Sequence, residues 1–211
     1  MTKREGAVVK LLLATRNPGK LAELRRILTE ELGPDSDIEV VGLTDVPSYP
    51  ERPETGVTFA ENALAKAYEA VAATGLPAVA DDSGLTVDAL NGMPGVLSAR
   101  WSGRHGDDQG NLELVLAQVA DVPDDRRGAA FVCAAALVTP RGTETVAYGE
   151  WRGRLTRAPR GSNGFGYDPI FVPEGERRTS AELSAAEKDA ASHRGRAFRA
   201  LLPALRSLAG P

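Results

Sequence analysis

A lysine ends a glycine-containing turn near the start of the chain, in the segment TRNPGK of residues 15–20. Residues 8–14 before it are nearly all apolar, and leucines at three- and four-residue steps follow it. This order predicts a strand, a tight turn and an amphipathic helix, whose first backbone amides attract anions such as phosphate. Lys20 adds a full positive charge there. The alternative is an ordinary turn with an exposed lysine, because a Walker A loop would need glycine at Ala14 and Ser or Thr at Leu21.

Two adjacent aspartates, Asp81 and Asp82, follow a short apolar run at 77–80 and precede Ser83 and Gly84. We expect a strand that ends at this pair, because α/β folds place their ligands at strand ends. Neighbouring side chains of a regular strand point to opposite faces, so one carboxylate faces a site unless the backbone turns. The alternative is a solvated turn in which both side chains accept hydrogen bonds from local amides.

The residue types available as metal ligands favour a hard cation that binds oxygen. The chain has two histidines and one cysteine, so a metal would be bound mainly by carboxylate oxygens. Mg²⁺ fits this pattern, because it takes one or two carboxylates and completes its shell with water and substrate phosphates. Glu54, in an irregular proline-rich loop over 44–56, is a candidate second carboxylate.

The segment SNGFGYDP of residues 162–169 places an aromatic residue between two glycines. Glycines let the backbone approach a ligand closely, so either Phe165 or Tyr167 is a candidate to stack on a flat base. The alternative is a tight loop with Phe165 packed inward. Three basic side chains follow near the start of the last predicted helix: Lys188, His193 and Arg194. Such charges most often form a solvated helix face.

The hydrophobic pattern indicates alternating strands and helices, which is typical of α/β proteins. The predicted strands cover 8–14, 38–43 and 77–80, followed by a hairpin of AAFVCAAALVTP and TETVAYGEW and a strand at PIFVP. The predicted helices cover 21–32, closed by Gly33; 58–75, with a capping box of Thr58 and Glu61; 112–119; and a C-terminal helix from Ser184, capped with Glu187 and kinked or shortened by Pro203.

Length and composition favour one ordinary globular domain. The chain has 211 residues, 42% of them hydrophobic and 26% charged, with a net charge of −4 that argues against non-specific adhesion to nucleic acid or anionic membranes. Cys133 is the only cysteine, which fits a reducing compartment. No apolar run reaches the roughly 18 residues of a membrane span. We therefore expect a cytoplasmic protein.

Five segments, in order, resemble the signatures of the inosine/xanthosine triphosphate pyrophosphatase family. They are TRNPGKLAEL, ETGVTFAENALAKA, ADDSGLTVDALNGMPGVLSARWSG, SNGFGYDPIFVPEG and LSAAEKDAASHRGRA. The resemblance runs from about Leu11 to Leu205 and leaves the arginine-rich stretch 152–160 without a role. It implies hydrolysis of noncanonical purine nucleoside triphosphates (ITP, dITP and XTP) to the monophosphate and pyrophosphate, which keeps them out of DNA and RNA.

The resemblance also implies roles for individual residues. Asp82 is implied to be the catalytic proton acceptor and, with Glu54, a ligand of Mg²⁺. The implied substrate-binding residues are Thr15, Asn17, Lys20, Lys66, Ser83, Phe165, Gly166, Tyr167, Asp168, Lys188, His193 and Arg194.

The fold implied by the resemblance is α/β, with an elongated central mixed β-sheet flanked by helices and two lobes with an active-site cleft between them. The expected protein is a single domain over residues 1–211 and a homodimer that binds a nucleoside triphosphate but neither nucleic acid nor membrane. Two rivals are a pyrophosphatase of the septum-inhibitor-like group and a non-catalytic nucleotide-binding regulator. The intact SHR and FGYDP segments disfavour the first, and the presence of Glu54, Asp82 and Lys20 disfavours the second.

Overall fold

The computed structural model describes residues 8–34, 36–50 and 52–209. The described residues form six strands: β1 (Val9–Leu13), β2 (Ile38–Gly42), β3 (Ala78–Val87), β4 (Gly128–Val138), β5 (Glu144–Leu155) and β6 (Phe171–Pro173). The α-helices are α1 (Pro18–Leu32), α2 (Phe59–Thr74), α3 (Asp108–Gln118), α4 (Ala185–Ala191) and α5 (His193–Arg206). The strand order is β2-β1-β3-β4-β5-β6, with β1 parallel to β2 and β3, and β5 antiparallel to β6. The predicted α/β class with a mixed sheet is therefore confirmed.

The described chain divides into two compact units. Unit 1 contains the described residues up to Asp81, together with Ala134–Ala147 and those from Ala197 onward; unit 2 contains Asp82–Cys133 and Tyr148–Arg196. The predicted single domain over 1–211 and the cleft between two lobes stay predictions. Residues 1–7, 35, 51, 210 and 211 lie outside the described part of that domain.

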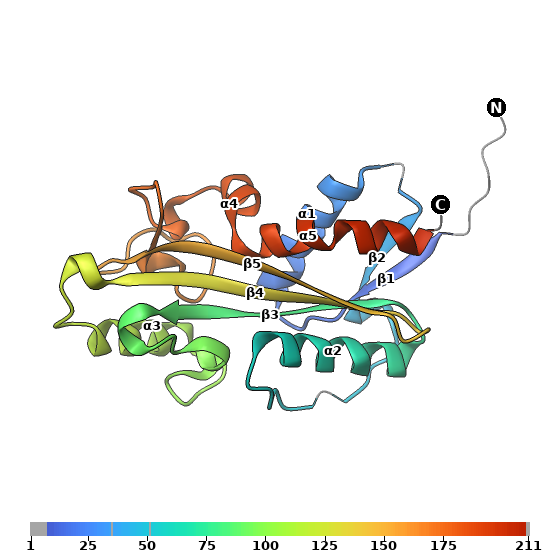
Figure 1. Ribbon diagram of the computed structural model, residues 1–211, viewed down its shortest axis with the longest axis horizontal. Coiled ribbons are helices and arrows are strands. Elements are labelled where there is room, and N and C mark those ends of the chain that lie inside the picture. The colour runs from blue at the N-terminus through green and yellow to red at the C-terminus, as the bar shows by residue number, and fades with distance from the viewer. Residues whose placement is uncertain (1–7, 35, 51, 210–211) are drawn as a thin grey trace. The chain divides into compact units, whose positions relative to one another are not determined.

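In unit 1 the helices cover both faces of the parallel strands, with α1 and the end of α5 on one side and α2 on the other (Figure 1). Helix α2 buries Ala63, Ala67 and Ala70, which recur at helical spacing and lie in one apolar cluster with Leu12 and Val41. Alanines let a helix pack closely on a sheet. Both faces of β1 are thus covered, which explains its nearly continuous apolar sequence.

Unit 2 has a separate core that is richer in aromatic residues. The rings of Phe131 and Phe171 meet edge to face, with centroids 4.7 Å apart, and Trp151 tilts against Phe171 at 5.6 Å. Helices α3 and α4 lie on opposite sides of the strands in this unit (Figure 1). Arg127 is buried beside the core, and its guanidinium donates to the carbonyl oxygens of Leu155, Val119 and Thr156, so it joins three chain segments.

The prediction that a strand ends at the two aspartates was wrong. Strand β3 continues from Ala78 through Asp81 and Asp82 to Val87, and both aspartates are buried. Charged residues inside a strand oppose the local apolar pattern, but Lys20 of α1 donates to Asp81, and the Ser83 amide of the same strand donates to Asp82. The side chains of Asp81 and Asp82 therefore alternate across the strand.

The C-terminal helix is two helices, not one. It breaks at Ser192, whose backbone is extended (φ −66°, ψ 160°) and whose hydroxyl accepts a hydrogen bond from the Gly195 amide. Helix α5 then continues past Pro203 to Arg206, so the proline does not shorten the helix, and the kink predicted as the alternative stays a prediction. The break allows the basic residues on either side of Ser192 to take different orientations.

Several local predictions are confirmed. Strands β4 and β5 are sheet neighbours joined by residues 139–143, and Ser184 and Glu187 form a reciprocal capping box. The capping box predicted for α2 is only half formed. The Thr58 hydroxyl accepts the Glu61 amide at 3.2 Å, but the Glu61 carboxylate accepts the amide of Val57 instead of that of Thr58.

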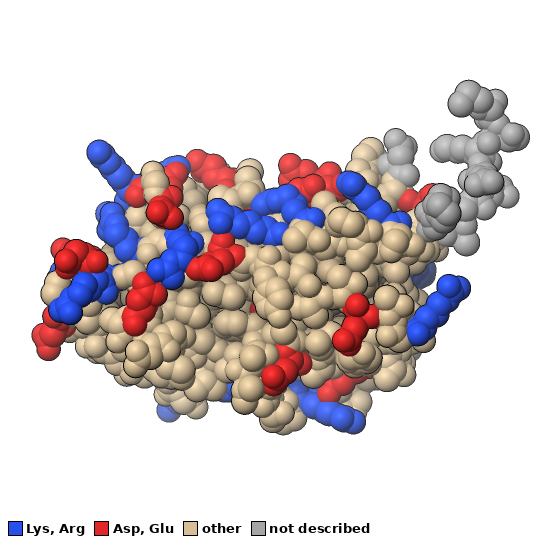
Figure 2. All heavy atoms as spheres, viewed as in Figure 1, with Lys and Arg blue, Asp and Glu red and all other residues tan. Residues whose placement is uncertain are grey.

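Charged side chains of both signs are interspersed on the molecular face drawn in Figure 2. Cys133 is fully buried. Among the described residues, no helix has the length and apolar character needed to cross a membrane.

Candidate active site

The turn between β1 and α1 is built by its own residues. Asn17 is the N-cap of α1, and its side-chain oxygen accepts the Lys20 amide at 3.1 Å. The Thr15 hydroxyl accepts the Asn17 amide at 3.3 Å, and Pro18 begins the helix. Thr15 and Asn17 therefore have a structural role in shaping the turn, which places Lys20 in the first turn of the helix. Substrate contacts by these two side chains stay predictions.

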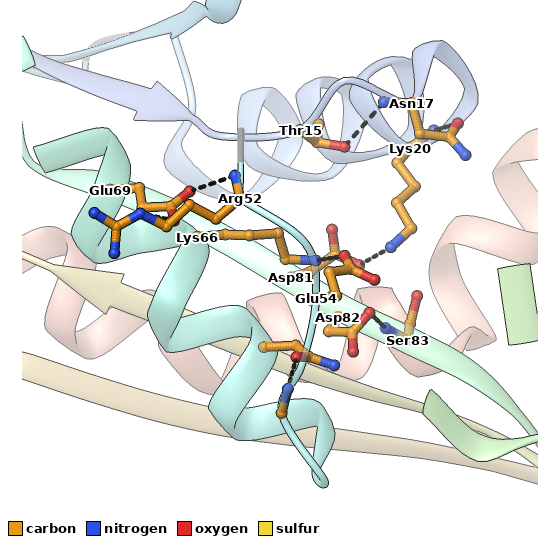
Figure 3. Close-up of polar contacts among 12 residues, drawn as sticks. Thr15, Asn17, Lys20, Arg52, Glu54, Lys66, Glu69, Asp81, Asp82 and Ser83 are labelled. Atoms are coloured by element: carbon orange, nitrogen blue, oxygen red, sulfur yellow. Dashed lines mark hydrogen bonds and ion pairs between the residues drawn. The ribbon is translucent and has the colours of Figure 1, made fainter. Parts of the chain in front are cut away.

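Lys20 contacts the buried aspartate of β3. Its Nζ donates to Asp81 Oδ2 at 3.0 Å, and the side chain of Asp81 is fully buried (Figure 3). The sheet register explains this contact, because Leu13 pairs with Val79, so the turn after β1 lies next to the continuation of β3. The sequence offered Asp81 and Asp82 as a candidate acidic pair, but the family resemblance implied a role for Asp82 only.

The loop that carries Glu54 lies along one face of α2 (Figure 3). Gly56 donates its amide to Asn62 Oδ1 at 2.8 Å, Lys66 Nζ donates to Glu54 Oε1 at 2.8 Å, and Arg52 pairs with Glu69 at 3.4 Å. The helix residues of these pairs, Asn62, Lys66 and Glu69, are spaced four and three residues apart, so they lie on one face of α2. This face of α2 holds the Glu54 loop, which has no regular secondary structure of its own.

The charges of these pairs balance within unit 1. Lys20 and Lys66 face Asp81 and Glu54, two cations against two carboxylates. A neutral cluster of this kind attracts a polyanion only weakly, and each lysine must share or exchange its carboxylate when phosphate oxygens arrive. A divalent cation beside the carboxylates would provide the missing positive charge.

Asp82 opens unit 2, and its Oδ1 accepts the Ser83 amide at 3.0 Å (Figure 3). The Ser83 hydroxyl accepts Arg194 Nη2 at 2.9 Å, so the predicted substrate contacts Ser83 and Arg194 are brought together across 111 residues of sequence. Gly84 follows, and a side chain there would overlap Ser98 and the Gly95 carbonyl. The close approach of these segments requires glycine.

Asp168 organises the loop of residues 162–168. Its Oδ1 accepts the Ser180 hydroxyl at 2.8 Å, and its Oδ2 accepts both the Phe165 amide at 2.9 Å and Lys188 Nζ at 2.5 Å. The residue is 2% exposed. Asp168 is thus bound by protein donors on both oxygens, and it fixes the loop backbone and the lysine at once.

Phe165 lies beside two of the predicted cations. Lys188 Nζ is 5.2 Å from the ring centroid and Arg194 Cζ is 5.1 Å from it, both within the range of about 6 Å in which a cation interacts with an aromatic ring. A flat base that stacks on Phe165 would meet hydrogen-bond donors next to the ring. Unit 2 therefore combines a stacking surface with fixed donors.

Two predicted site residues lie in the core of unit 2. The Tyr167 hydroxyl donates to the Ser98 carbonyl at 2.8 Å and the ring belongs to the apolar cluster, so burial raises the pKa of Tyr167. Of the two aromatic residues considered for base stacking, Phe165 is partly exposed and Tyr167 is buried. The His193 ring is also buried, and it stacks on Phe131 with centroids 4.9 Å apart. Substrate contacts by Tyr167 and His193 stay predictions.

The arginine-rich stretch 152–160 makes contacts within unit 2. Arg152 donates to both carboxylate oxygens of Asp88, and Arg157 donates to Asp124 and to two carbonyl oxygens near the end of α3. Arg160 donates to the carbonyl of Arg177 at 3.0 Å. These contacts tie loops together, so the stretch has a structural explanation.

The parallel strands, covering helices and lysine–carboxylate pairs define an α/β protein with a candidate phosphate site and a candidate base site. A sequence profile of the Ham1 family matches residues 11–204. The chain belongs to this family.

Relatives of known name support this assignment. The dITP/XTP pyrophosphatase of Mycobacteroides abscessus is 66% identical over 95% of this chain and 96% of its own length, and that of Nocardia farcinica is 66% identical over 96% and 97%. Among solved structures, a HAM1 protein from Coxiella burnetii is 43% identical, with a TM-score of 0.81 over 93% of this chain and 98% of its own. The similarity covers both units.

Proposed function

We propose that this protein is a nucleoside triphosphate pyrophosphatase that hydrolyses ITP, dITP and XTP to the monophosphate and pyrophosphate. The reaction removes these noncanonical purine nucleotides from the pool before they enter DNA or RNA. The observation that carries the proposal is the identity of 66% over 95% of the chain with a protein named dITP/XTP pyrophosphatase. The two candidate clusters supply the chemistry that such a reaction needs.

The residues of unit 1 act on the triphosphate in this proposal. Lys20 and Lys66 bind phosphate oxygens and exchange part of their contact with Asp81 and Glu54 for them. Thr15 and Asn17 keep the turn in shape, so the cation of Lys20 is positioned before the ligand binds. Positioning and neutralisation of charge provide most of the acceleration in phosphoryl transfer.

Mg²⁺ is the proposed cofactor, and the available donors fit it. They are the carboxylate oxygens of Glu54 and Asp82, and because no three or more His, Cys, Asp or Glu side chains gather among the described residues, water and substrate phosphates would have to supply the other ligands. Mg²⁺ binds through one or two carboxylates and completes its shell with water and phosphate. Glu54 and Asp82 would hold the ion, a pairing that rests on the family resemblance because the two belong to different units. When bound, the ion would neutralise negative charge on the phosphates.

Asp82 is the proposed catalytic base. Its Oδ1 is oriented by the Ser83 amide, and its burial keeps bulk water from competing at the carboxylate. In the proposed reaction Asp82 orients or deprotonates a water that attacks the α-phosphate, and pyrophosphate leaves. The proton is held on the carboxylate until the product departs.

The residues of unit 2 select the base. Hypoxanthine and xanthine present an acceptor at the purine 6-position, whereas adenine presents an amino donor. Lys188 and Arg194, beside the Phe165 ring, are donors that pair with the oxo group and leave an adenine amino group unpaired. An unpaired buried polar group costs about 1–3 kcal/mol, and sites built on such pairs discriminate strongly. His193, Gly166, Tyr167 and Asp168 support this pocket in the proposal.

The proposal includes a homodimer in the cytoplasm that binds neither nucleic acid nor membrane. A single cysteine, which is buried, suits a reducing compartment. The net charge of −4 disfavours general binding to nucleic acid, and on the face drawn in Figure 2 charges of both signs are interspersed.

The test is a product assay on the purified protein with Mg²⁺ and separately supplied ITP, XTP, dITP, GTP, ATP and pyrimidine triphosphates. Pyrophosphate should be released from ITP, XTP and dITP with kcat/KM about 100-fold or more above that for ATP.

Chelation should abolish turnover and added Mg²⁺ should restore it. Asp82→Asn should keep its circular dichroism spectrum and lose most turnover. Release of orthophosphate, or binding without turnover, would contradict the proposal, and efficient pyrimidine hydrolysis would favour the septum-inhibitor-like group.

A further inference from the structure

Asp108, the first residue of α3, reaches the loop of residues 162–168 from a distant part of the sequence. Its Oδ2 accepts the backbone amide of Gly166 at 2.9 Å, across 58 residues. Nothing in the spacing of the sequence indicated this contact. Asp108 had no predicted role, and the five resembling segments do not include it.

Gly166 is the point at which the loop directs its two aromatic side chains differently. The Phe165 ring lies beside Lys188 and Arg194, whereas the Tyr167 ring lies in the core with its hydroxyl on Ser98. Gly166 has a φ of +61°, in the left-handed region that favours glycine. A bond to the Gly166 amide therefore restrains the backbone next to Phe165.

The two successive amides of this loop each bind a carboxylate. The Phe165 amide donates to Asp168, which is buried and belongs to the loop, while the Gly166 amide donates to Asp108, which is exposed and belongs to α3. The first bond sets the internal shape of the loop. The second bond, from the Gly166 amide to Asp108, attaches the loop to helix α3 and so restrains the position of the loop.

Helix α3 does not need the Asp108 side chain for its cap. Asp107 is the N-cap, and its Oδ1 accepts the Gly110 amide at 3.0 Å. Asp108 sits in the first turn, where a negative charge also suits the helix dipole. The adjacent aspartates thus divide two tasks: Asp107 caps the helix, and Asp108 contacts the loop.

We propose that Asp108 is a positioning residue that holds the backbone at Gly166 so that the Phe165 ring stays in place to receive the purine. This inference rests on the proposed function, because it assumes that the base stacks on Phe165. It adds a residue outside the resembling segments to the determinants of base binding. It also assigns α3 a part in recognition without any contact to substrate.

The experiment compares four variants in the pyrophosphate assay with ITP: Asp108→Ala, Asp108→Asn, Asp107→Ala and Phe165→Ala. Loss of a hydrogen bond to a charged acceptor should raise KM for ITP in Asp108→Ala by about five- to tenfold, with a smaller change in kcat. Asp108→Asn keeps an oxygen acceptor at the same place, so its KM should lie within about twofold of the wild type.

Asp107→Ala is the matched control for the stability of α3. It should lower the melting temperature more than Asp108→Ala does, because it removes the N-cap, and it should leave KM unchanged. If Asp107→Ala and Asp108→Ala raise KM equally, Asp108 acts through helix stability and the inference is overturned.

The remaining outcomes separate this inference from the proposed function. If the wild type releases no pyrophosphate from ITP, the proposed function fails. If the wild type is active but Phe165→Ala leaves KM unchanged, the assumption about the base is wrong and the inference falls with it. If Phe165→Ala raises KM and Asp108→Ala does not, the positioning role of Asp108 is overturned while the proposed function stands.

Discussion

The Lys66–Glu54 pair of unit 1 and the Lys188–Asp168 pair of unit 2 differ in how firmly the protein holds them. Glu54, the partner of Lys66, comes from an irregular loop, and its side chain is 24% exposed. Asp168, the partner of Lys188, has a side chain that is 3% exposed and also accepts the Ser180 hydroxyl and the Phe165 amide. The Glu54 carboxylate can therefore change partners, whereas the Asp168 carboxylate is fixed by its hydrogen-bond donors.

This difference matches the two tasks that we propose. A triphosphate changes its charge distribution during hydrolysis, so the lysines near it must be able to share their carboxylate partners. Recognition of a base instead requires donors whose positions do not change, because selectivity depends on leaving the wrong base unpaired. Removing Glu54 should therefore impair catalysis, whereas removing Asp168 should impair folding.

The largest effect is expected from Asp168→Ala. Lys188 would remain buried without this partner, and breaking a buried ion pair by removing one side costs about 3–5 kcal/mol. Denaturant unfolding should show a loss of that size in the free energy of unfolding. A loss below about 1 kcal/mol would mean that this pair is as weakly held as a surface pair, and its distinction from the Lys66–Glu54 pair would fail.

Glu54→Gln should lower activity strongly and stability only slightly. We expect kcat/KM for ITP at saturating Mg²⁺ to fall about 100-fold, or about 2.7 kcal/mol in transition-state stabilisation. The free energy of unfolding should change by no more than about 1 kcal/mol, because the pair with Lys66 is partly exposed.

Glu144→Gln is the matched control for Glu54→Gln. Glu144 also lies in unit 1 and accepts a side-chain hydrogen bond, from the Tyr68 hydroxyl at 2.6 Å, but it lies outside the proposed site. Its kcat/KM should equal that of the wild type. Equal losses in Glu54→Gln and Glu144→Gln would remove Glu54 from the mechanism.

The smallest effect concerns acid stability at α4, the helix that carries Lys188. Hydrogen bonds from the Ser184 amide and hydroxyl, and then from Arg178, lower the pKa of Glu187 to about 2 from its ordinary 4.5. A lowered pKa means that this contribution to stability is present above the ordinary pKa and is lost as the pH falls toward 2. Glu187→Gln should make the free energy of unfolding less dependent on pH between about 5 and 2. A slope identical to that of the wild type would contradict the capping role.

Local sequence determined the elements whose stabilising contacts lie nearby. The leucine spacing of 21–32, the Asn17 cap and Gly33 bound α1, and the Ser184–Glu187 box begins α4. The order of the motifs also pointed to Lys20, Glu54 and Lys66 of the first cluster, but not to Asp81. Such features are predictable because capping and helix periodicity involve residues within a few positions of each other.

Tertiary structure decided the rest, because the deciding partners are far away in the chain. Strand β3 continues through Asp81 because Lys20, 61 residues earlier, supplies a cation to a buried carboxylate. Gly166 is bound by Asp108 across 58 residues, and Arg194 reaches Ser83 across 111. Burial of a charge is unfavourable unless a partner compensates it. In the sequence alone, a charged residue after an apolar run therefore predicts the end of a strand, because its distant partner is not visible.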